Sequence, residues 1–318
     1  MLEMDEQNVQ RCVGQFAQNS KREYEKRQRM IKVIASDLDG TLLNEHHDLN
    51  KFTSDMIKKA QEKGMRFIIA TGRSFPQVEE LITNHELCCD CLVSSGAEVR
   101  DSHREVVFSG HMKFSDCKDI YEVLKEYTVP FMFYTKDGDY CIGKLEELEQ
   151  NVITHIFSFH QTLTIDEIKK VPFYKKMMEN TKMVSSFEEL EALDIEVIKI
   201  FIFSNDLAML GEIQQKLLLN ANIAVSSSFP NNLEITDVVA QKGPVLKWYI
   251  ESLGYSMDEV MVFGDSMNDY SMLSMDFGAT VAMENADEMV KAVSKYVTKS
   301  NIDDGVAYAI AQLLKHQR

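Results

Sequence analysis

Cysteine, proline and tryptophan are scarce in this chain, whose 318 residues include 6 cysteines, 5 prolines and 1 tryptophan. So few cysteines in so long a chain exclude a small fold held together by disulfides. Cys88, Cys89 and Cys91 form the only cluster, and no second pair of ligands follows it, as a zinc site would require. We interpret these residues as thiols that lead into a buried strand, with a metal or redox role as the alternative. Reduced cysteines favour a cytoplasmic location.

Long apolar runs are also missing. No run approaches the roughly 18 residues of a membrane-spanning helix, so we expect no association with a membrane. Residues 1–30 contain many charges and lack the apolar centre of a secretory signal. We expect this extension to be loosely ordered and dispensable, with a docking arm as the alternative and Met30 as an alternative translation start.

Positive charge is the third shortage, because 34 lysines and arginines face 50 acidic residues and give a net charge of -16. Nucleic-acid binding needs a basic face, so this balance argues against such a partner. An acidic protein that handles a phosphorylated substrate must gather positive charge locally, through a metal ion, a few basic residues and helix N-termini. The length favours two domains.

Strand and helix patterns alternate from residue 31 onward, beginning with the apolar run Ile31 to Ala35 and a helical pattern from Asn50 to Lys63 that ends before Gly64. This alternation predicts an α/β fold with a Rossmann-like, doubly wound parallel sheet, whose catalytic groups lie at the carboxyl ends of the strands. We assign residues 31–111 and 236–318 to this core.

The pattern changes between residues 112 and 235. Two turn sequences, 136–139 and 229–232, separate strand-like segments and predict hairpins, and Val197 to Phe203 reads as a strong strand. Hairpin-paired strands with helices between them describe an α+β domain inserted into the core as a cap.

Acidic residues follow the first predicted strand in the sequence Asp37-Leu38-Asp39-Gly40-Thr41. Residues two apart in an extended chain project the same way, so the two carboxylates should point together and require a cation. We interpret the pair as catalytic: Asp37 would attack phosphorus, and Asp39 would protonate the leaving oxygen and later activate water. The alternative is an aspartate-rich turn without catalytic function.

Three further elements carry polar groups at predicted junctions between strands and helices. Thr71-Gly72-Arg73 offers a hydroxyl and backbone amides to phosphate oxygens, and Lys242 begins a helix and can neutralise a transferring phosphoryl group. Gly264-Asp265-Ser266-Met267-Asn268-Asp269 offers a carboxylate for Mg²⁺ and, in Asp269, an anchor behind it. For each element there is an alternative without catalytic function. Thr71-Gly72-Arg73 can be a common turn, Lys242 a solvated surface lysine, and the 264–269 segment a helix N-cap.

Together these four elements resemble, in order and spacing, the haloacid dehalogenase superfamily of phosphohydrolases over residues 31–318. Asn301-Ile302-Asp303-Asp304-Gly305-Val306-Ala307 and the position of the insertion are similar to its Cof-type branch. The resemblance implies phosphorylation of Asp37. It implies magnesium held by Asp37, the backbone carbonyl of Asp39, and Asp265. It implies a phosphate site formed by the backbone amides of Leu38 and Gly72 and by the residues Thr71, Lys242 and Asn268.

One position departs from the family pattern, because Ser95-Gly96-Ala97 stands where relatives commonly carry Asn-Gly-Ala. We predict a Mg²⁺-dependent phosphatase that hydrolyses phosphate monoesters of small metabolites, such as sugar phosphates or phosphorylated cofactors, through an aspartyl phosphate. The alternatives are a phosphomutase or phosphotransferase on the same core, and a non-catalytic phospho-receiver module. Polar residues of the insertion are candidates for substrate contacts, namely His155, His160, Tyr174 and Lys175.

Overall fold

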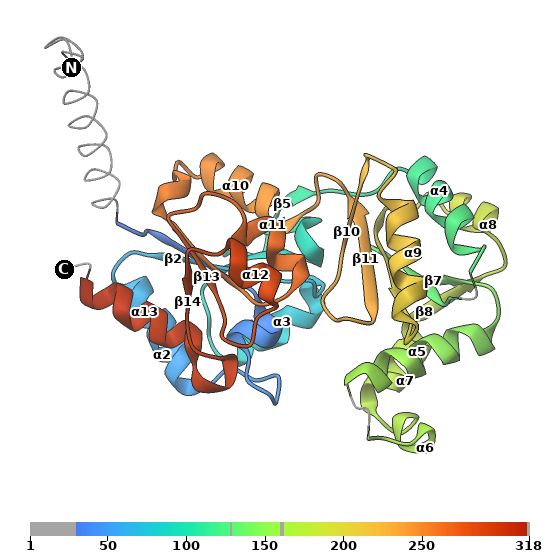
Figure 1. Ribbon diagram of the computed structural model, residues 1–318, viewed down its shortest axis with the longest axis horizontal. Coiled ribbons are helices and arrows are strands. Elements are labelled where there is room, and N and C mark those ends of the chain that lie inside the picture. Colours follow the sequence, from blue (N-terminus) through green and yellow to red (C-terminus); the bar gives the residue numbers. More distant parts are fainter. Residues whose placement is uncertain (1–29, 128, 160–161, 317–318) are drawn as a thin grey trace, which may run out of the picture.

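The computed structural model of the protein describes residues 30–127, 129–159 and 162–316 and shows two lobes, each built on its own sheet (Figure 1). The predicted extension, residues 1–29, lies outside the described residues, so the expectations about it stay predictions. Within the described part, no helix is both long and apolar enough to cross a membrane.

The first lobe contains a sheet of eight strands in the order β14-β13-β12-β1-β2-β3-β4-β5. The six strands from β14 to β3 pair in parallel, which confirms the predicted parallel α/β core. The strands are β1 (Val33–Ser36), β2 (Arg66–Ala70), β3 (Asp90–Val93), β4 (Glu98–Arg100), β5 (Val106–Ser109), β12 (Val260–Gly264), β13 (Ala279–Ala282) and β14 (Tyr296–Val297).

Helices pack on this sheet, and α2 and α13 contact each other on the side opposite α10 (Figure 1). Gly64 follows α2 and has φ at +82°, the left-handed conformation expected of a glycine at the C-terminal end of a helix. The core helices are α2 (Lys51–Glu62), α3 (Phe75–Asn84), α10 (Lys242–Ser252), α11 (Tyr270–Leu273), α12 (Glu288–Val293) and α13 (Gly305–His316). Short turns of helix are η1 (Leu38–Leu42), η2 (Ser94–Gly96), η3 (Met257–Glu259), η4 (Met267–Asp269) and η5 (Asn301–Asp303).

The second lobe, the cap, contains six strands in the order β10-β11-β9-β6-β7-β8, antiparallel except between β7 and β8. Both predicted hairpins are present, and β9 has the predicted bounds. The strands are β6 (Phe131–Thr135), β7 (Gly138–Ile142), β8 (Thr181–Val184), β9 (Val197–Phe203), β10 (Ile223–Ser226) and β11 (Asn232–Asp237). The helices are α4 (Phe114–Leu124), α5 (Leu145–Phe159), α6 (Ile165–Ile168), α7 (Pro172–Asn180), α8 (Phe187–Glu191) and α9 (Leu207–Leu217).

Side-chain alternation gives the cap sheet two different faces. On β9 and β11, Ile200, Ile202, Leu233 and Ile235 pack into an apolar cluster beneath α4, α8 and α9. Residues of the opposite parity therefore lie on the other face. That face is partly covered by α5 and α7, which form a smaller apolar cluster on it.

Two connections join the lobes. The chain leaves the core after β5, and it returns from β11 to α10 through only residues 238–241. Gly96 lies against this return segment with φ at +103°, and a Cβ there would lie 2.7 Å from the carbonyl carbon of Gln241. Only glycine allows this close approach. β11 runs to Asp237, two residues past the expected boundary.

The strands β4 and β5 were not predicted. They run antiparallel to their neighbours and extend the core sheet beyond β3. They are short, and a turn at residues 101–105 separates them, so their alternation is too brief to give a clear signal in the sequence.

Candidate active site

Asp37 directly follows β1 at the carboxyl edge of the parallel sheet. Its backbone N–H donates to the carbonyl of Phe263 at 3.1 Å, which fixes it beside the end of β12. The side chain is 5% exposed. After Asp37 the chain turns, and the N–H of Leu43 closes the turn on the carbonyl of Leu38 at 2.9 Å.

Asp265 follows β12 and faces this turn. Gly40 has φ at +77°, and a Cβ there would lie 2.4 Å from Asp265 Oδ2, so the approach of the two loops requires glycine. The Thr41 hydroxyl donates to Asp265 Oδ1 at 2.6 Å.

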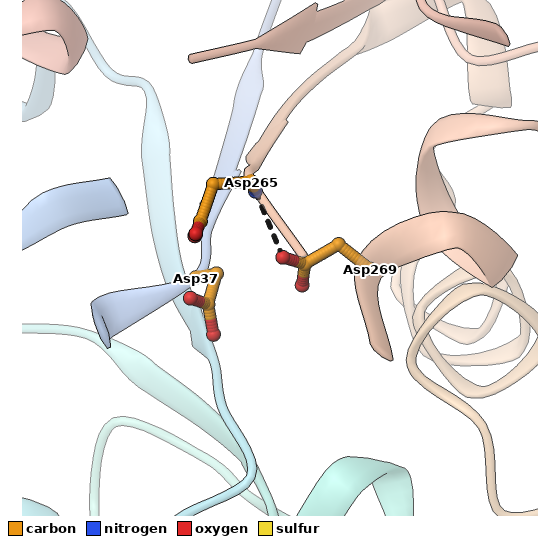
Figure 2. A group of neighbouring side chains, drawn as sticks. All are labelled: Asp37, Asp265 and Asp269. Atoms are coloured by element: carbon orange, nitrogen blue, oxygen red, sulfur yellow. Dashed lines mark hydrogen bonds between the residues drawn. The ribbon is translucent and has the colours of Figure 1, made fainter. Parts of the chain in front are cut away.

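Asp269 completes a cluster of three carboxylates. In Figure 2 it lies beside Asp265, whose backbone N–H donates to Asp269 Oδ2 at 3.0 Å. One ligand oxygen from each of Asp37, Asp265 and Asp269 lies within 4.8 Å of the others, the only such group among the described residues. Asp269 is fully buried. Both of its oxygens accept hydrogen bonds, so it holds the loop while Asp37 and Asp265 remain available to a metal.

Lys242 supplies positive charge from the start of α10. Its Nζ donates to Asp37 Oδ1 and to Asp269 Oδ1, each at 2.7 Å, and lies 3.4 Å from Asn268 Oδ1. The side chain has no exposed surface. Burial alone would lower the pKa of Lys242. The carboxylates of Asp269 and Asp37 stabilise its charged form more strongly, so the pKa is raised.

One lysine does not balance three carboxylates. Burial and the neighbouring Asp269 raise the pKa of Asp37 well above its usual value, although Lys242 opposes this. Burial and Asp269 raise the pKa of Asp265 to about 7. These carboxyl groups are ionised at neutral pH only at a cost, which a divalent cation would remove, and oxygen ligands suit magnesium. The donor set therefore fits the expected metal.

Asp39 does not join this cluster, although the D-x-D spacing predicted two carboxylates pointing together. Its carboxylate pairs with Arg73, whose Nε lies 2.8 Å from Oδ2, and with Nδ1 of His47 at 3.2 Å. Burial opposes ionisation of Asp39, but the hydrogen bonds from His47 and Arg73 prevail and lower its pKa to about 2. The helical turn η1 begins at Leu38, between the two aspartates, so their side chains do not share one direction, and that of Asp39 meets Arg73 after β2.

The loop after β2 lies next to Asp39. Thr71 is buried, and its N–H donates to the carbonyl of Leu92 at 2.8 Å, while the N–H of Arg73 donates to the Thr71 hydroxyl at 3.2 Å. A Cβ at Gly72 would lie 3.7 Å from Nδ2 of Asn268. The loops that follow β2 and β12 therefore approach each other at Gly72 and Asn268.

The cap reaches this loop with two residues that sequence reasoning missed. Lys199 Nζ donates to the carbonyl of Gly72 and to Glu234 Oε2, each at 3.0 Å. The hydroxyl of Ser95, the position that departs from the family pattern, donates to Glu234 Oε2 at 2.9 Å. The only signal in the sequence is one lysine within the apolar strand 197–203 and one glutamate within 232–237.

The four cap residues that the sequence offered as candidates for substrate contacts lie on or near the helices α5 and α7, except for one outside the described residues. His155 stacks on Phe201, with ring centroids 6.0 Å apart, and burial lowers its pKa to about 3. The Tyr174 hydroxyl donates to Glu149, and Lys175 lies on α7. His160 lies outside the described residues.

The thiol cluster lies at the start of β3. Cys89 and Cys91 are buried and Cys88 is exposed, and all three are free thiols.

Comparison with known proteins agrees with this architecture. Residues 34–310 match the family model of the haloacid dehalogenase-like hydrolases. The chain is 28% identical over 280 residues to the 5-amino-6-(5-phospho-D-ribitylamino)uracil phosphatase YcsE of Bacillus subtilis (strain 168), covering 88% of this chain and 94% of that protein. It is also 28% identical to YwtE of the same organism, which carries the same phosphatase name, covering 90% and 99%.

The solved structure of a haloacid dehalogenase-like hydrolase from B. subtilis superposes with a TM-score of 0.76 at 26% identity, covering 91% of this chain and 100% of that one. The protein is a hydrolase that acts on phosphate esters. It belongs to the haloacid dehalogenase-like hydrolases, as the four motifs predicted, and its relatives support the Cof-type branch.

Proposed function

We propose that the protein is a Mg²⁺-dependent phosphatase that hydrolyses phosphate monoesters of small metabolites through a phosphoaspartate at Asp37. The observation that carries the proposal is the meeting of Asp37, Asp265 and Asp269 with the buried Lys242 at one edge of the sheet. Such a group suits a dianionic ester, because a metal ion and an ammonium can neutralise phosphate oxygens together.

Asp37 and Asp265 would hold the magnesium through their carboxylates, with the backbone carbonyl of Asp39 as the third ligand from the protein. When bound, the ion supplies positive charge that offsets both the carboxylates and the phosphate. Asp269 keeps Lys242 and the loop after β12 in position, because its two oxygens accept from the Lys242 ammonium and from backbone N–H groups.

In the first step, a carboxylate oxygen of Asp37 forms a bond to phosphorus while the bond from phosphorus to the leaving-group oxygen breaks. Asp39 gives its proton to that oxygen. In the second step, Asp39 takes a proton from water, the water oxygen attacks phosphorus, and Asp37 and inorganic phosphate are released.

Asp39 must separate from Arg73 and His47 before it can donate a proton, because these partners keep its carboxyl group ionised. We infer that the entering substrate displaces them and that the arrangement described above is the resting one. The backbone amides of Leu38 and Gly72, the Thr71 hydroxyl, Lys242 and the Asn268 amide would hold the phosphate oxygens.

The relatives support a small phosphorylated metabolite as the substrate, since two of them are named as phosphatases of a phosphorylated ribitylamino-uracil. The five cysteines of the described part are free thiols, which supports a cytoplasmic location.

The test is phosphate release from a panel of phosphorylated metabolites, with and without chelator. Activity should disappear on chelation and return with Mg²⁺. Added sugar acceptors should leave phosphate release unchanged, whereas a phosphotransferase would release less phosphate and form new esters. Hydrolysis that survives complete chelation would show that the carboxylate cluster has another role.

A further inference from the structure

A pocket with a volume of about 360 Å³ lies on the cap between α4, α9 and the start of β10. The two helices contact each other and cover the apolar face of the cap sheet (Figure 1). The opposite face is the one that meets the core, since Lys199 on that face contacts Gly72. The pocket is therefore separate from the candidate active site.

Asp116 is the only buried residue among the charged residues that line this pocket. It lies in the first turn of α4 and is 4% exposed. Its Oδ1 accepts from the side-chain amides of Asn220 at 3.0 Å and Asn222 at 3.1 Å, which belong to the turn between α9 and β10. Its Oδ2 is also buried, and it has no hydrogen-bond partner among the described residues.

The turn between α9 and β10 does not by itself require a carboxylate at position 116. One acceptor oxygen serves both amides, so the side-chain oxygen of an asparagine would hold the turn without a charge. The first turn of a helix favours negative charge, but none of the N–H groups of α4 donates to Oδ2 of Asp116. A buried carboxylate oxygen without a donor is destabilising, so it indicates a ligand that supplies the donor.

The charges around the pocket favour a cation as this ligand. Asp119 lies one helical turn further along α4 and adds a second carboxylate at the exposed side of the pocket. Lys216 on α9 is turned toward Glu126, with Nζ 2.7 Å from Oε2, and lies 4.9 Å from the centroid of the Tyr127 ring. Its ammonium therefore does not neutralise Asp116.

The walls of the pocket indicate that the cation is organic. Ile120, Leu217 and Ile223 line it and belong to the apolar cluster of the cap. Among the described residues, no third carboxylate, histidine or cysteine joins Asp116 and Asp119 in a group that could hold a metal ion. The volume is in the range of sites for small molecules, so the ligand should carry an apolar body behind its charge.

We propose that the pocket between α4 and α9 binds a small aliphatic amine in its ammonium form. An ammonium group has only donors, which matches the acceptor Oδ2 of Asp116, and the hydrocarbon chain packs on Leu217 and Ile223. This second ligand site lies on the outer side of the cap and does not depend on the proposed phosphatase activity.

The first experiment compares n-butylamine, n-butanol and butyrate, which share a four-carbon chain and differ in charge. Mg²⁺ is present throughout, so that the carboxylates of the candidate active site do not compete for the amine. At pH 7 the amine is protonated. A hydrogen bond between charged partners should make it bind about 10- to 100-fold more tightly than n-butanol in calorimetric titration, and butyrate should not bind.

The second experiment repeats the titrations with Asp116→Asn. This variant removes the charge, and its side-chain oxygen can still accept from Asn220 and Asn222. It should bind n-butylamine no more tightly than n-butanol, and its melting temperature without ligand should not fall. Asp166→Asn is the matched control, because it removes an exposed carboxylate from the first turn of α6, outside the pocket. It should keep the preference for the amine.

A third measurement locates the ligand in the unaltered protein, so it holds even if Asp116→Asn does not fold. The NMR signals of the side-chain amides of Asn220 and Asn222 should shift on titration with n-butylamine, with the affinity found by calorimetry. Butyrate should leave them unchanged.

Three results would overturn the inference. They are equal affinity of the unaltered protein for n-butylamine and n-butanol, a preference for the amine that persists in Asp116→Asn, and signals of Asn220 and Asn222 that do not move. The second of these would mean that the negative net charge of the protein attracts the amine without a defined site. None of the three involves phosphate release, so the proposed function would stand.

Discussion

Replacing Asp265 with asparagine should stabilise the metal-free protein at pH 8 and remove its response to magnesium. Burial and Asp269 raise the pKa of Asp265 in the folded state to about 7, from an ordinary value of 3.8. A carboxyl group whose pKa is raised by folding stabilises the fold only while it is protonated. Its contribution is fully present below about pH 4 and is lost as the pH rises through about 7.

The size of the effect follows from this shift. A change from 3.8 to about 7 corresponds to at most about 4 kcal/mol, and partial exposure of the side chain reduces the expected gain to about 2 kcal/mol. For domains of this size that is a rise in melting temperature of about 4 to 8 °C. The amide oxygen of asparagine can still accept from Thr41, so the substitution removes the charge and keeps the hydrogen bond.

Thermal unfolding of both proteins in chelator at pH 8 and at pH 5, and again with Mg²⁺, measures the effect. The advantage of the variant should shrink at pH 5, and Mg²⁺ should raise the melting temperature of the unaltered protein alone. Asp119→Asn, at an exposed position of α4, is the matched control and should change nothing. A variant that melts no higher than the unaltered protein in chelator at pH 8, or that still responds to Mg²⁺, would refute the reasoning.

Three further predictions concern the chemistry of the site. Lys242→Ala should lower kcat/KM by about 100-fold or more, whereas Lys247→Ala on the same helix should leave it nearly unchanged, and equal small effects would make Lys242 a structural residue. Rapid quenching during turnover followed by borohydride should reduce an acyl phosphate at Asp37 and change the mass of its peptide, while an unmodified peptide would favour direct attack by water. Arg73→Gln should raise the pKa of Asp39 from about 2 toward 3.8 and cost about 1 kcal/mol at pH 7, a loss that fades as the pH falls below about 4 in urea unfolding.

The core of the site could be predicted because parallel strands end at one edge of a sheet. Asp37, Thr71 and Asp265 each follow a predicted strand. Their positions along the chain were therefore sufficient to predict that they lie near one another at this edge. Lys242 is different, because its position at a helix start does not say which way the side chain points. A neutralising role and a solvated surface lysine both fitted the sequence, and the structure shows Lys242 buried between two carboxylates.

The orientation of Asp39 and the cap contacts could not be predicted in the same way. The spacing of Asp37 and Asp39 implies a common direction only while the chain stays extended, and the helical turn η1 already begins at Leu38, between the two aspartates. Lys199 and Glu234 become neighbours only once β9 and β11 pair in one register. A shift of one residue would turn either side chain away, and no pattern within a single strand determines that register.

The return segment of residues 238–241 gives the molecule a mechanical property. It is the only covalent link between β11, which carries Glu234, and the first turn of α10, which carries Lys242. The hydroxyl of Thr236 on β11 donates to the carbonyl of Ala240 in this segment at 3.0 Å, which restrains the connection. A displacement of β11 would therefore be transmitted to Lys242, beside Asp37, over four residues. If a ligand that moved the strand changed the affinity of the site for phosphate, bound phosphate would by reciprocity change the affinity for that ligand by the same factor.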